Sequence, residues 1–257
     1  MTRKMKIGWE KAILKVFEKK GGVVTLRDLY QEIPVLIPKT SSIDINHTIR
    51  AYLRRLKQDK KRIKQIGLST YALIDVHYKN SLYEKIKSKE YEKVFFDGIS
   101  KDEIHGYVEG ILIELGNFSG YNTYTPDKNI IFNGKRLSDL VYYQNIPQFS
   151  YPDILKKVRH IDVIWFQEGF PIKTFDVENS TDFSKALLRA YQLKYFNVKF
   201  FLVSDDNKKK IFEDRINLKP FNNISKITNF VSYKEIYDIY RVSAIHNKKT
   251  SESCIFK

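Results

Sequence analysis

Three carboxylates, Asp162, Asp176 and Glu178, interrupt two apolar stretches of the chain, residues 160–166 and 170–178. Both stretches carry the β-branched and aromatic residues that are typical of β-strands. Acids that converge on one point repel one another unless a cation lies between them, and hard oxygen ligands favour Mg²⁺, for which Mn²⁺ can substitute. The three acids therefore predict a metal site for phosphate chemistry, in which each is a metal ligand and a catalytic residue.

The turn between the two stretches decides which acids meet. We expect a turn that pairs Phe166 with Phe170. Asp162 then faces Thr174, and Asp176 is its diagonal neighbour. Because side chains two apart share one face of a strand, all three acids project to the same side. The alternative is that the acids of the second strand are exposed edge charges that oppose aggregation.

Further acids lie on a helix expected over residues 102–116. Glu109 and Glu114 lie on this helix, and helix solubility alone explains either acid. His105 lies one turn before Glu109, and we expect it to be a surface or helix-end residue.

Two Pro-Asp pairs are set aside as metal ligands. Pro126-Asp127 follows a predicted strand and is typical of a turn. Pro152-Asp153 opens a short helix, where proline and an acid are both favoured. His160 directly precedes the first apolar strand, and we expect a structural role for it.

The charge of the chain indicates a polyanionic partner. The 257 residues carry a formal net charge of +15, and residues 1–75 hold 17 Lys and Arg against 7 Asp and Glu, which leaves +10 in that part. A basic charge with this distribution is typical of nucleic-acid binding, although compositional bias of a genome can also raise the total. The hydrophobic fraction of 42% is enough for the cores of two modest domains.

Composition also argues against several classes of protein. Cys254 is the only cysteine, so we expect neither a disulfide framework nor a thiolate zinc site. No stretch approaches the roughly 20 apolar residues of a membrane span, and the charged first residues lack the apolar core of a signal peptide. No glycine-rich phosphate loop indicates ATP dependence. We therefore expect a cytoplasmic protein without a membrane partner.

Residues 1–76 have the order of a small DNA-binding domain. Apolar spacing predicts helices over residues 9–17, 26–32 and 44–59, followed by two short strands within 62–74. This order resembles a winged helix-turn-helix domain, a family in which the third helix enters the DNA major groove and the hairpin contacts the backbone. A protein-interaction module with a solvated basic face is the alternative. The cations expected to contact DNA here are Arg50, Arg54, Arg55, Lys57, Lys60, Lys61, Arg62 and Lys64.

The rest of the chain predicts a helical connector over 77–101, an α+β domain over 102–242, and a basic, flexible tail over 243–257. The elements expected in the domain are a helix over 102–116, a strand over 121–125, an irregular segment over 126–159, the two acidic strands, a helix over 182–196, a strand over 198–204, a helix over 206–217, a strand near Phe230 and a helix over 233–240. The fold class is α/β in its wider α+β sense, with a mixed β-sheet core flanked by helices.

This order of elements over residues 100–240 resembles the PD-(D/E)xK nuclease superfamily, which includes many restriction endonucleases. The resemblance implies that Asp162 and Asp176 are the first and second metal-binding acids, and that Glu178 stands where the family usually has lysine. Because the superfamily often has a glutamate on the preceding helix, the resemblance also makes Glu109 the candidate for an accessory metal ligand and Glu114 the second choice. A minority of restriction enzymes resemble this chain in having glutamate there. Glu178 could orient or deprotonate the attacking water, or add a third metal ligand.

Three further residues bear on this resemblance. Lys173 is the nearest upstream lysine, but it lies on the opposite strand face by parity, so we do not expect it to replace the missing lysine. On the helix after the acidic strands, Gln192 matches a glutamine often found near the scissile phosphate in related nucleases, which makes it a candidate catalytic residue. Arg189, one turn earlier, could contact DNA phosphate. A solvent-facing position explains either residue equally well.

Together, the residues and the resemblance predict a Mg²⁺-dependent type II restriction-like endonuclease that cuts double-stranded DNA to 5′-phosphate and 3′-hydroxyl ends. A homodimer or a transient pair on DNA would cut both strands, and a DNA methyltransferase could be a companion. Two alternatives stay open: a DNA-binding regulator with an inactive nuclease fold, which the missing lysine favours, and a structure-specific nuclease for junctions or repair intermediates.

Overall fold

The computed structural model describes residues 7–38, 44–76, 82–83, 86 and 101–252. The chain divides into two compact units, Met1–Ser88 with Ala244–Lys257, and Lys89–Ser243. The connector predicted over 77–101 lies almost entirely outside the described residues. Among the described helices, none is long and apolar enough to cross a membrane.

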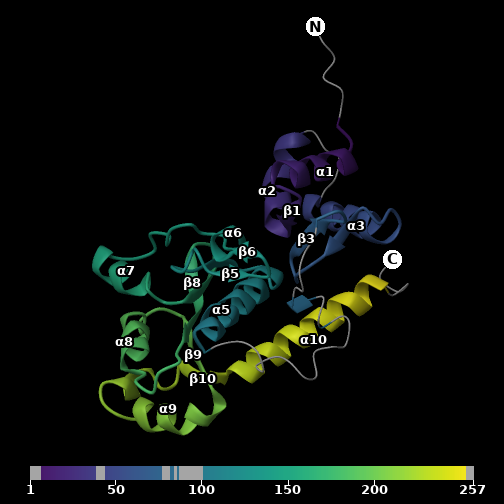
Figure 1. The fold of residues 1–257 in the computed structure, drawn as a ribbon. Helices are drawn as coiled ribbons and strands as arrows, with labels where there is room; N and C mark the ends of the chain where they lie inside the picture. Colours follow the sequence, from purple (N-terminus) through teal and green to yellow (C-terminus); the bar gives the residue numbers. More distant parts are fainter. Residues whose placement is uncertain (1–6, 39–43, 77–81, 84–85, 87–100, 253–257) are drawn as a thin grey trace. The chain divides into compact units, whose positions relative to one another are not determined.

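The N-terminal unit consists of three helices and a small antiparallel sheet (Figure 1). Its elements are α1 (Trp9–Lys19), β1 (Val23–Thr25), α2 (Leu26–Leu36), α3 (Ile45–Gln58), β2 (Ile63–Gln65) and β3 (Thr70–Leu73), with β3 between β1 and β2. The apolar stripes of the three helices meet in one core, where Phe17, Leu29 and Leu53 are buried. The predicted third helix and the two strands after it are confirmed, with bounds close to those expected.

The second helix is longer than the sequence predicts. It begins with a capping box, in which Thr25 Oγ1 accepts a hydrogen bond from Asp28 N and the Asp28 carboxylate accepts one from Thr25 N. The expected end at Glu32 is wrong, because α2 continues through Pro34 to Leu36. Pro34 cannot donate the hydrogen bond that a helix directs to Tyr30 O, so α2 lacks one backbone hydrogen bond in its last turn.

The second unit is built around a mixed five-stranded sheet with the strand order β10-β9-β8-β7-β4 (Figure 1). The strands are β4 (Asn122–Tyr124), β7 (Val163–Gln167), β8 (Phe170–Val177), β9 (Lys199–Ser204) and β10 (Thr228–Ser232). The sheet is antiparallel from β4 to β8 and parallel from β8 to β10. The remaining elements are α5 (Lys101–Phe118), β5 (Ile131–Phe132), β6 (Lys135–Arg136), α6 (Leu137–Leu140), α7 (Pro152–Val158), α8 (Ser184–Gln192), α9 (Lys209–Ile216), the short 3-10 helices Asp206–Lys208 and Phe221–Ile224, and α10 (Tyr233–Glu252). The residues of α10 from Ala244 on belong to the first unit. The predicted α+β class is confirmed.

Helices cover both faces of this sheet. On one face the indole of Trp165 packs against Phe175, and its Nε1 donates a hydrogen bond to Leu112 O of α5 at 3.1 Å. On the other face, residues of α7, α8 and α9 enclose the main apolar core around Ile164 and Phe166. Because side chains alternate along a strand, the two faces of β7 and β8 meet different helices.

The turn of the β7–β8 hairpin is tighter than predicted. Gln167 pairs with Phe170, so only Glu168 and Gly169 lie between the strands. Both turn residues have a left-handed backbone, with φ of 52° and 84°. This is the conformation that two-residue hairpin turns favour, because it matches the twist of the flanking strands.

The register beyond the turn also differs from the predicted one. A bulge in β8, where Ile172 is the extra residue between Pro171 and Lys173, shifts the pairing by one more residue, and Val163 faces Phe175. Continued by one position, this register brings Asp162 opposite Asp176 and not opposite Thr174. The shifts at the turn and at the bulge add up to two residues, so each side chain keeps the strand face that its parity predicts.

Two predicted helices have different bounds. The helix expected over 182–196 is shorter, and it begins after Asp182, whose Oδ1 accepts a hydrogen bond from Ser184 N in a local turn. The helix expected to end near Tyr240 continues to Glu252, so the predicted tail over 243–257 is helical up to that residue. Because the sequence has neither glycine nor proline after residue 220, nothing in it stops α10.

Glycines on α5 allow the segment after β4 to approach the helix closely. A Cβ atom added to Gly106 would lie 2.5 Å from Ile130 Cγ2, and one added to Gly110 would lie 2.2 Å from Phe132 Cγ. Side chains at these two positions would push the segment that contains Asp127 away from the helix.

We expect Gly110→Ala to destabilise the second unit. The new methyl group must displace the buried Phe132 ring, and overpacking of this kind costs about 1–3 kcal/mol, more than the roughly 1 kcal/mol that alanine gains over glycine as a helix former. Urea unfolding followed by circular dichroism measures the change. Gly8→Ala, where a Cβ atom meets nothing within 4 Å, is the matched control. An unchanged or higher stability of Gly110→Ala would contradict the packing argument.

Candidate active site

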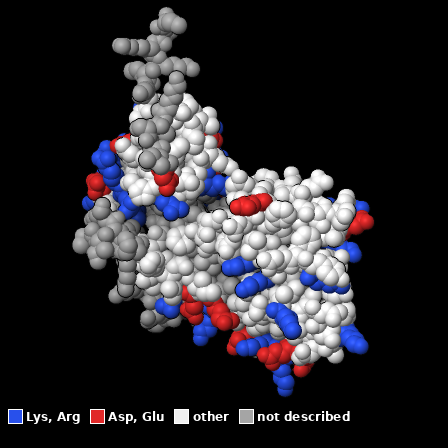
Figure 2. Space-filling view, turned by 180° about the vertical axis from the view of Figure 1, so that it is seen from behind, with Lys and Arg blue, Asp and Glu red and all other residues white. Residues whose placement is uncertain are grey.

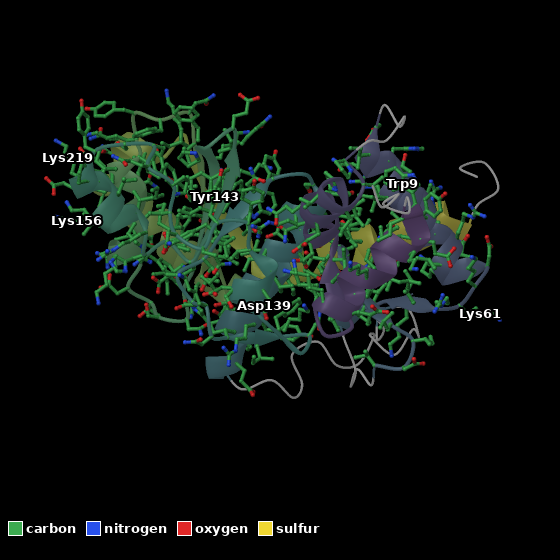
Figure 3. The ribbon with its side chains drawn as sticks, turned by 90° about the horizontal axis from the view of Figure 1, so that it is seen from above. Trp9, Lys61, Asp139, Tyr143, Lys156 and Lys219 are labelled. Carbon is green, nitrogen blue, oxygen red and sulfur yellow. The ribbon has the colours of Figure 1, made fainter. Side chains whose placement is uncertain are left out.

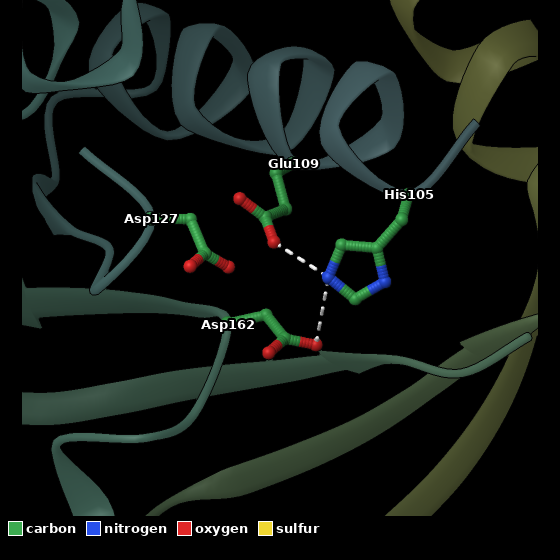
Figure 4. Close-up of side chains that lie close together, drawn as sticks. All are labelled: His105, Glu109, Asp127 and Asp162. Carbon is green, nitrogen blue, oxygen red and sulfur yellow. Dashed lines mark ion pairs between the residues drawn. The ribbon is translucent and has the colours of Figure 1, made fainter. Parts of the chain in front are cut away.

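Four side chains that could hold a metal ion converge at one end of the sheet (Figure 4). His105 and Glu109 project from α5, Asp127 follows β4, and Asp162 immediately precedes β7. One ligand atom from each residue lies within 4.8 Å of those of the other three. The group thus combines an imidazole with three carboxylates.

Local geometry explains why these residues meet. His105 and Glu109 are four residues apart on α5, and such residues are neighbours on one helix face. β4 runs antiparallel to β7, with Tyr124 opposite Ile164. The chain that leaves β4 therefore lies beside the chain that enters β7, which brings the segment of Asp127 to Asp162.

The contacts within the group are short. His105 Nε2 lies 2.7 Å from Glu109 Oε1 and 3.7 Å from Asp162 Oδ2 (Figure 4). Thr125 Oγ1 donates to Glu109 Oε2 at 3.5 Å, and Val177 N donates to Asp162 Oδ2 at 2.7 Å. Glu109 is fully buried, and among the described residues its Oε1 has no hydrogen-bond partner of standard geometry. A buried carboxylate oxygen without a well-formed hydrogen bond is suited to bind a cation.

Burial and crowding shift the ionisation of the group. Burial raises the pKa of Glu109 to about 7, against the opposing contact with His105. Burial also raises the pKa of Asp162 to about 7, and the charge of Glu109 adds to this effect. Burial alone would lower the pKa of His105, but the contact with Glu109 and the charge of Asp162 raise it to about 9. Without a metal ion, the positive charge of the His105 imidazolium and protonation of the acids therefore offset the negative charge of this group.

A second set of charges lies on β8 and α8. Arg189 Nε donates a hydrogen bond to Asp176 Oδ1 at 2.8 Å, and Arg189 Nη2 donates to the same oxygen. Arg189 Nη2 also lies 3.5 Å from Glu178 Oε1. Burial and the charge of Asp162 together raise the pKa of Asp176 to about 8, against the lowering effect of Arg189. The two sets are therefore electrostatic neighbours.

The structure separates the predicted site residues into these two sets. Glu109 and Asp162 lie together beside α5, whereas Asp176 and Glu178 share Arg189. Gln192 lies elsewhere on α8, where its Nε2 donates to Leu188 O and its Oε1 accepts from Lys157 at 3.5 Å.

Two other lysine and glutamate candidates lie outside both sets. The Lys173 ammonium lies over the rings of Tyr121 and Trp165, on the sheet face opposite to Asp176, as parity predicts. Glu114 is buried and accepts a hydrogen bond from Tyr240 at 2.5 Å.

Sequence reasoning missed His105 and Asp127. His105 was expected to be a surface or helix-end residue without a part in the site. Its side chain is 29% exposed, but its Nε2 points to the carboxylates of Glu109 and Asp162. Asp127 lies in a turn, as predicted, yet its carboxylate joins the same group. The four-residue spacing from Glu109 was a signal for His105, and the position directly after a strand was one for Asp127.

Several predicted DNA-binding cations of the N-terminal unit have partners within that unit. Lys60 Nζ lies 2.5 Å from Glu10 Oε2 of α1, and an Arg62 terminal nitrogen lies 3.8 Å from Glu10 Oε1. Arg50 Nε donates to the Tyr30 hydroxyl of α2 at 2.6 Å. All three cations are nevertheless exposed, so their charge acts on the surrounding solvent.

The other predicted cations differ in exposure. Arg55 and Lys61 are exposed, and Figure 3 labels Lys61 at the turn between α3 and β2. Arg54, Lys57 and Lys64 are half-buried. Figure 2 shows Lys and Arg side chains over one face of the molecule together with Asp and Glu.

The second unit is thus an α+β domain with a carboxylate–imidazole group at one end of a mixed sheet. Residues 85–255 match the family model described as the type II restriction enzyme NmeDI C-terminal domain, and the chain belongs to this family. The match confirms the prediction of a restriction-endonuclease-like protein. Comparisons with curated proteins and with solved structures gave no match.

We expect Glu109→Gln to stabilise the metal-free protein at pH 8 but not at pH 5. The pKa of Glu109 is raised from 4.5 to about 7 by folding. The neutral carboxyl therefore costs no stability below pH 4.5, whereas the free energy of unfolding falls as the pH rises from 4.5 through about 7. Glutamine removes this loss because it carries no charge. Thermal unfolding in EDTA at both pH values measures the difference, with Glu213→Gln on the exposed side of α9 as the control. A Glu109→Gln protein less stable than the wild type at pH 8 would contradict the electrostatic account.

Proposed function

We propose that this chain is a metal-dependent, type II restriction-like endonuclease that hydrolyses phosphodiester bonds of double-stranded DNA. The observation that carries the proposal is the group of Glu109, Asp127 and Asp162 within the part of the chain that matches a restriction-enzyme family. DNA as the partner follows from that family and agrees with the formal net charge of +15.

The donor set fits a hard divalent cation. Glu109, Asp127 and Asp162 offer carboxylate oxygens, and among the described residues the buried Glu109 Oε1 has no hydrogen bond of standard geometry, only the ion pair with His105. Mg²⁺ favours such oxygen ligands, and Mn²⁺ can substitute for it. When bound, the cation would supply a nucleophilic water near neutral pH and neutralise charge on the phosphate.

The neighbouring charges have separate roles in this proposal. Asp176 lies beside Asp162 and adds negative charge to the same end of the sheet. The Glu178 side chain is 19% exposed, so solvent water can reach it, and it would orient or deprotonate the attacking water. Arg189 holds both acids in place and carries a positive charge that could contact DNA phosphate.

The PD-(D/E)xK assignment is part of the proposal. A mixed sheet with a helix on either face and acids on adjacent strands supports it, as does the family match. In this assignment Glu178 replaces the usual lysine, and Arg189 from α8 brings a cation to the same place. Cleavage of both strands would require two copies of the site, so a homodimer or a transient pair on DNA is proposed, and a DNA methyltransferase as a companion.

The deciding experiment is cleavage of methylated and unmethylated plasmid DNA with Mg²⁺, Mn²⁺ or EDTA. We expect discrete, metal-dependent fragments. Asp162→Asn should reduce the rate by more than the roughly 10–100-fold that loss of an outer-shell partner causes, because it removes a direct ligand. Asp153→Asn is the matched control, since the Asp153 side chain is 91% exposed on α7. Equal cleavage by Asp162→Asn would exclude the proposed site.

A DNA-binding regulator with an inactive nuclease fold is the second candidate. Glu178 in place of the usual lysine favours it. Retained binding to duplex DNA, without cleavage under any of the metal conditions, would favour the regulator over the nuclease.

We further propose that the N-terminal unit is a winged helix that binds duplex DNA. The order of α1, β1, α2, α3 and the β2–β3 hairpin supports this, and so do the exposed cations Arg55 and Lys61. In this proposal α3 enters the major groove and the hairpin contacts the DNA backbone.

Arg55→Gln and Lys61→Gln should each weaken DNA binding and lower its salt dependence. Each lost phosphate contact reduces the slope of log K against log salt by about 1. Fluorescence anisotropy with a duplex oligonucleotide at several salt concentrations measures both effects. Lys15→Gln removes an equal charge from the exposed side of α1 and should leave the slope unchanged. Equal slopes in all three variants would count against the winged-helix proposal.

A further inference from the structure

His105 is an unusual member of a site that would hold only Mg²⁺. Its Nε2 atom lies 2.7 Å from Glu109 Oε1 and 3.7 Å from Asp162 Oδ2, so the ring nitrogen is directed at the carboxylates (Figure 4). An Asp or Glu at this position would crowd a fourth carboxylate into the group. The imidazole instead offers a nitrogen donor at the place where the three carboxylates meet.

Ligand chemistry distinguishes the ions that such a group accepts. Mg²⁺ favours oxygen ligands and keeps several of its waters. Imidazole nitrogen suits zinc, copper, iron and nickel. For a given set of nitrogen and oxygen ligands, affinity among the divalent first-row metals is lowest for Mn²⁺ and rises toward Cu²⁺, with Zn²⁺ below Cu²⁺. His105 and Glu109 are also one helical turn apart, a spacing that lets two side chains on one helix face bind a single ion.

We infer that His105, Glu109, Asp127 and Asp162 form one mixed nitrogen and oxygen site that selects a first-row transition metal, such as Mn²⁺ or Zn²⁺, over Mg²⁺. The inference deepens the proposed function, because it rests on the metal site of the proposed nuclease and names the class of ion. A second observation supports a ligand at this place: Glu109 is fully buried, and among the described residues its Oε1 has no hydrogen bond of standard geometry, although His105 Nε2 lies 2.7 Å away.

A competing role for His105 is that of an internal counter-ion. In that role the imidazolium would occupy the place of the cation among the acids and would have to leave before any metal binds. The two roles predict opposite effects of His105→Gln. Loss of a ligand weakens the binding of transition metals and leaves Mg²⁺ binding nearly unchanged, whereas loss of a counter-ion strengthens the binding of both ions.

Isothermal titration calorimetry of the full chain, freed of metal and titrated with MnCl₂, ZnCl₂ or MgCl₂, separates these roles. We expect His105→Gln to raise the Kd for Mn²⁺ and Zn²⁺ at least about tenfold, as loss of a nitrogen donor should do, and to change the Kd for Mg²⁺ by much less. Electron paramagnetic resonance of bound Mn²⁺ reports the loss of the nitrogen ligand independently of activity. Far-ultraviolet circular dichroism verifies that the variants are folded.

Two variants serve as controls. His160→Gln should leave all three affinities unchanged, because His160 is exposed and its Nε2 accepts a hydrogen bond from Arg159. Asp162→Asn should weaken the binding of every ion, which places the titrated site in this group. The inference is overturned if His105→Gln leaves the ratio of Mn²⁺ to Mg²⁺ affinity unaltered, or if it tightens the binding of both ions.

Failure of the inference can be told apart from failure of the proposed function. DNA cleavage with Mg²⁺ that depends on Asp162, together with an unaltered affinity ratio in His105→Gln, would overturn the inference and keep the nuclease. An affinity ratio that depends on His105, without DNA cleavage, would establish the metal site and overturn the nuclease.

Discussion

The concentration of buried negative charge at one end of the five-stranded sheet is the constraint on which the second unit depends. Glu109, Asp162 and Asp176 are all buried there, and burying an uncompensated carboxylate costs several kcal/mol or more. His105 of α5 compensates the first two acids, and Arg189 of α8 compensates the third. Because α5 and α8 contribute to opposite faces of the sheet, both helices must be packed before these acids are buried together.

The topology of the sheet decides which acids meet. β4 comes early in the domain, yet it lies at the sheet edge beside β7, in the antiparallel direction. This pairing brings Asp127 to Asp162 across a long, irregular connection. The glycines of α5 allow the same segment to approach the helix that carries Glu109. The group therefore depends on backbone packing that none of its own side chains supplies.

These dependences explain what the sequence could predict. Alternation and turn residues located the β7–β8 hairpin, and parity placed Lys173 on the face opposite to Asp176, because both rules act over a few residues. The register failed by two positions, one at a turn that is tighter than expected and one at a bulge, which leaves no signature in the pattern of apolar residues. Asp127 was interpreted as a turn residue, which is locally correct, but its approach to Asp162 depends on a strand pairing that local patterns do not disclose. His105 was set aside although it lies one turn from Glu109 on α5, so in this case a local signal was present.

The distribution of compensating charge bears on the choice between an active nuclease and an inactive fold. Replacing buried ionic groups with apolar residues of similar size is often neutral or stabilising, so a domain that served only as a scaffold would have little physical reason to keep three buried acids in one place. The compensation is also incomplete, since the pKa values of Glu109, Asp162 and Asp176 all remain raised. A site that keeps unfavourable charge in this way is suited to a ligand that relieves it. Glu178 departs from the lysine of the resembling nucleases, but Arg189 supplies a cation 3.5 Å away, so the departure does not leave that place without positive charge.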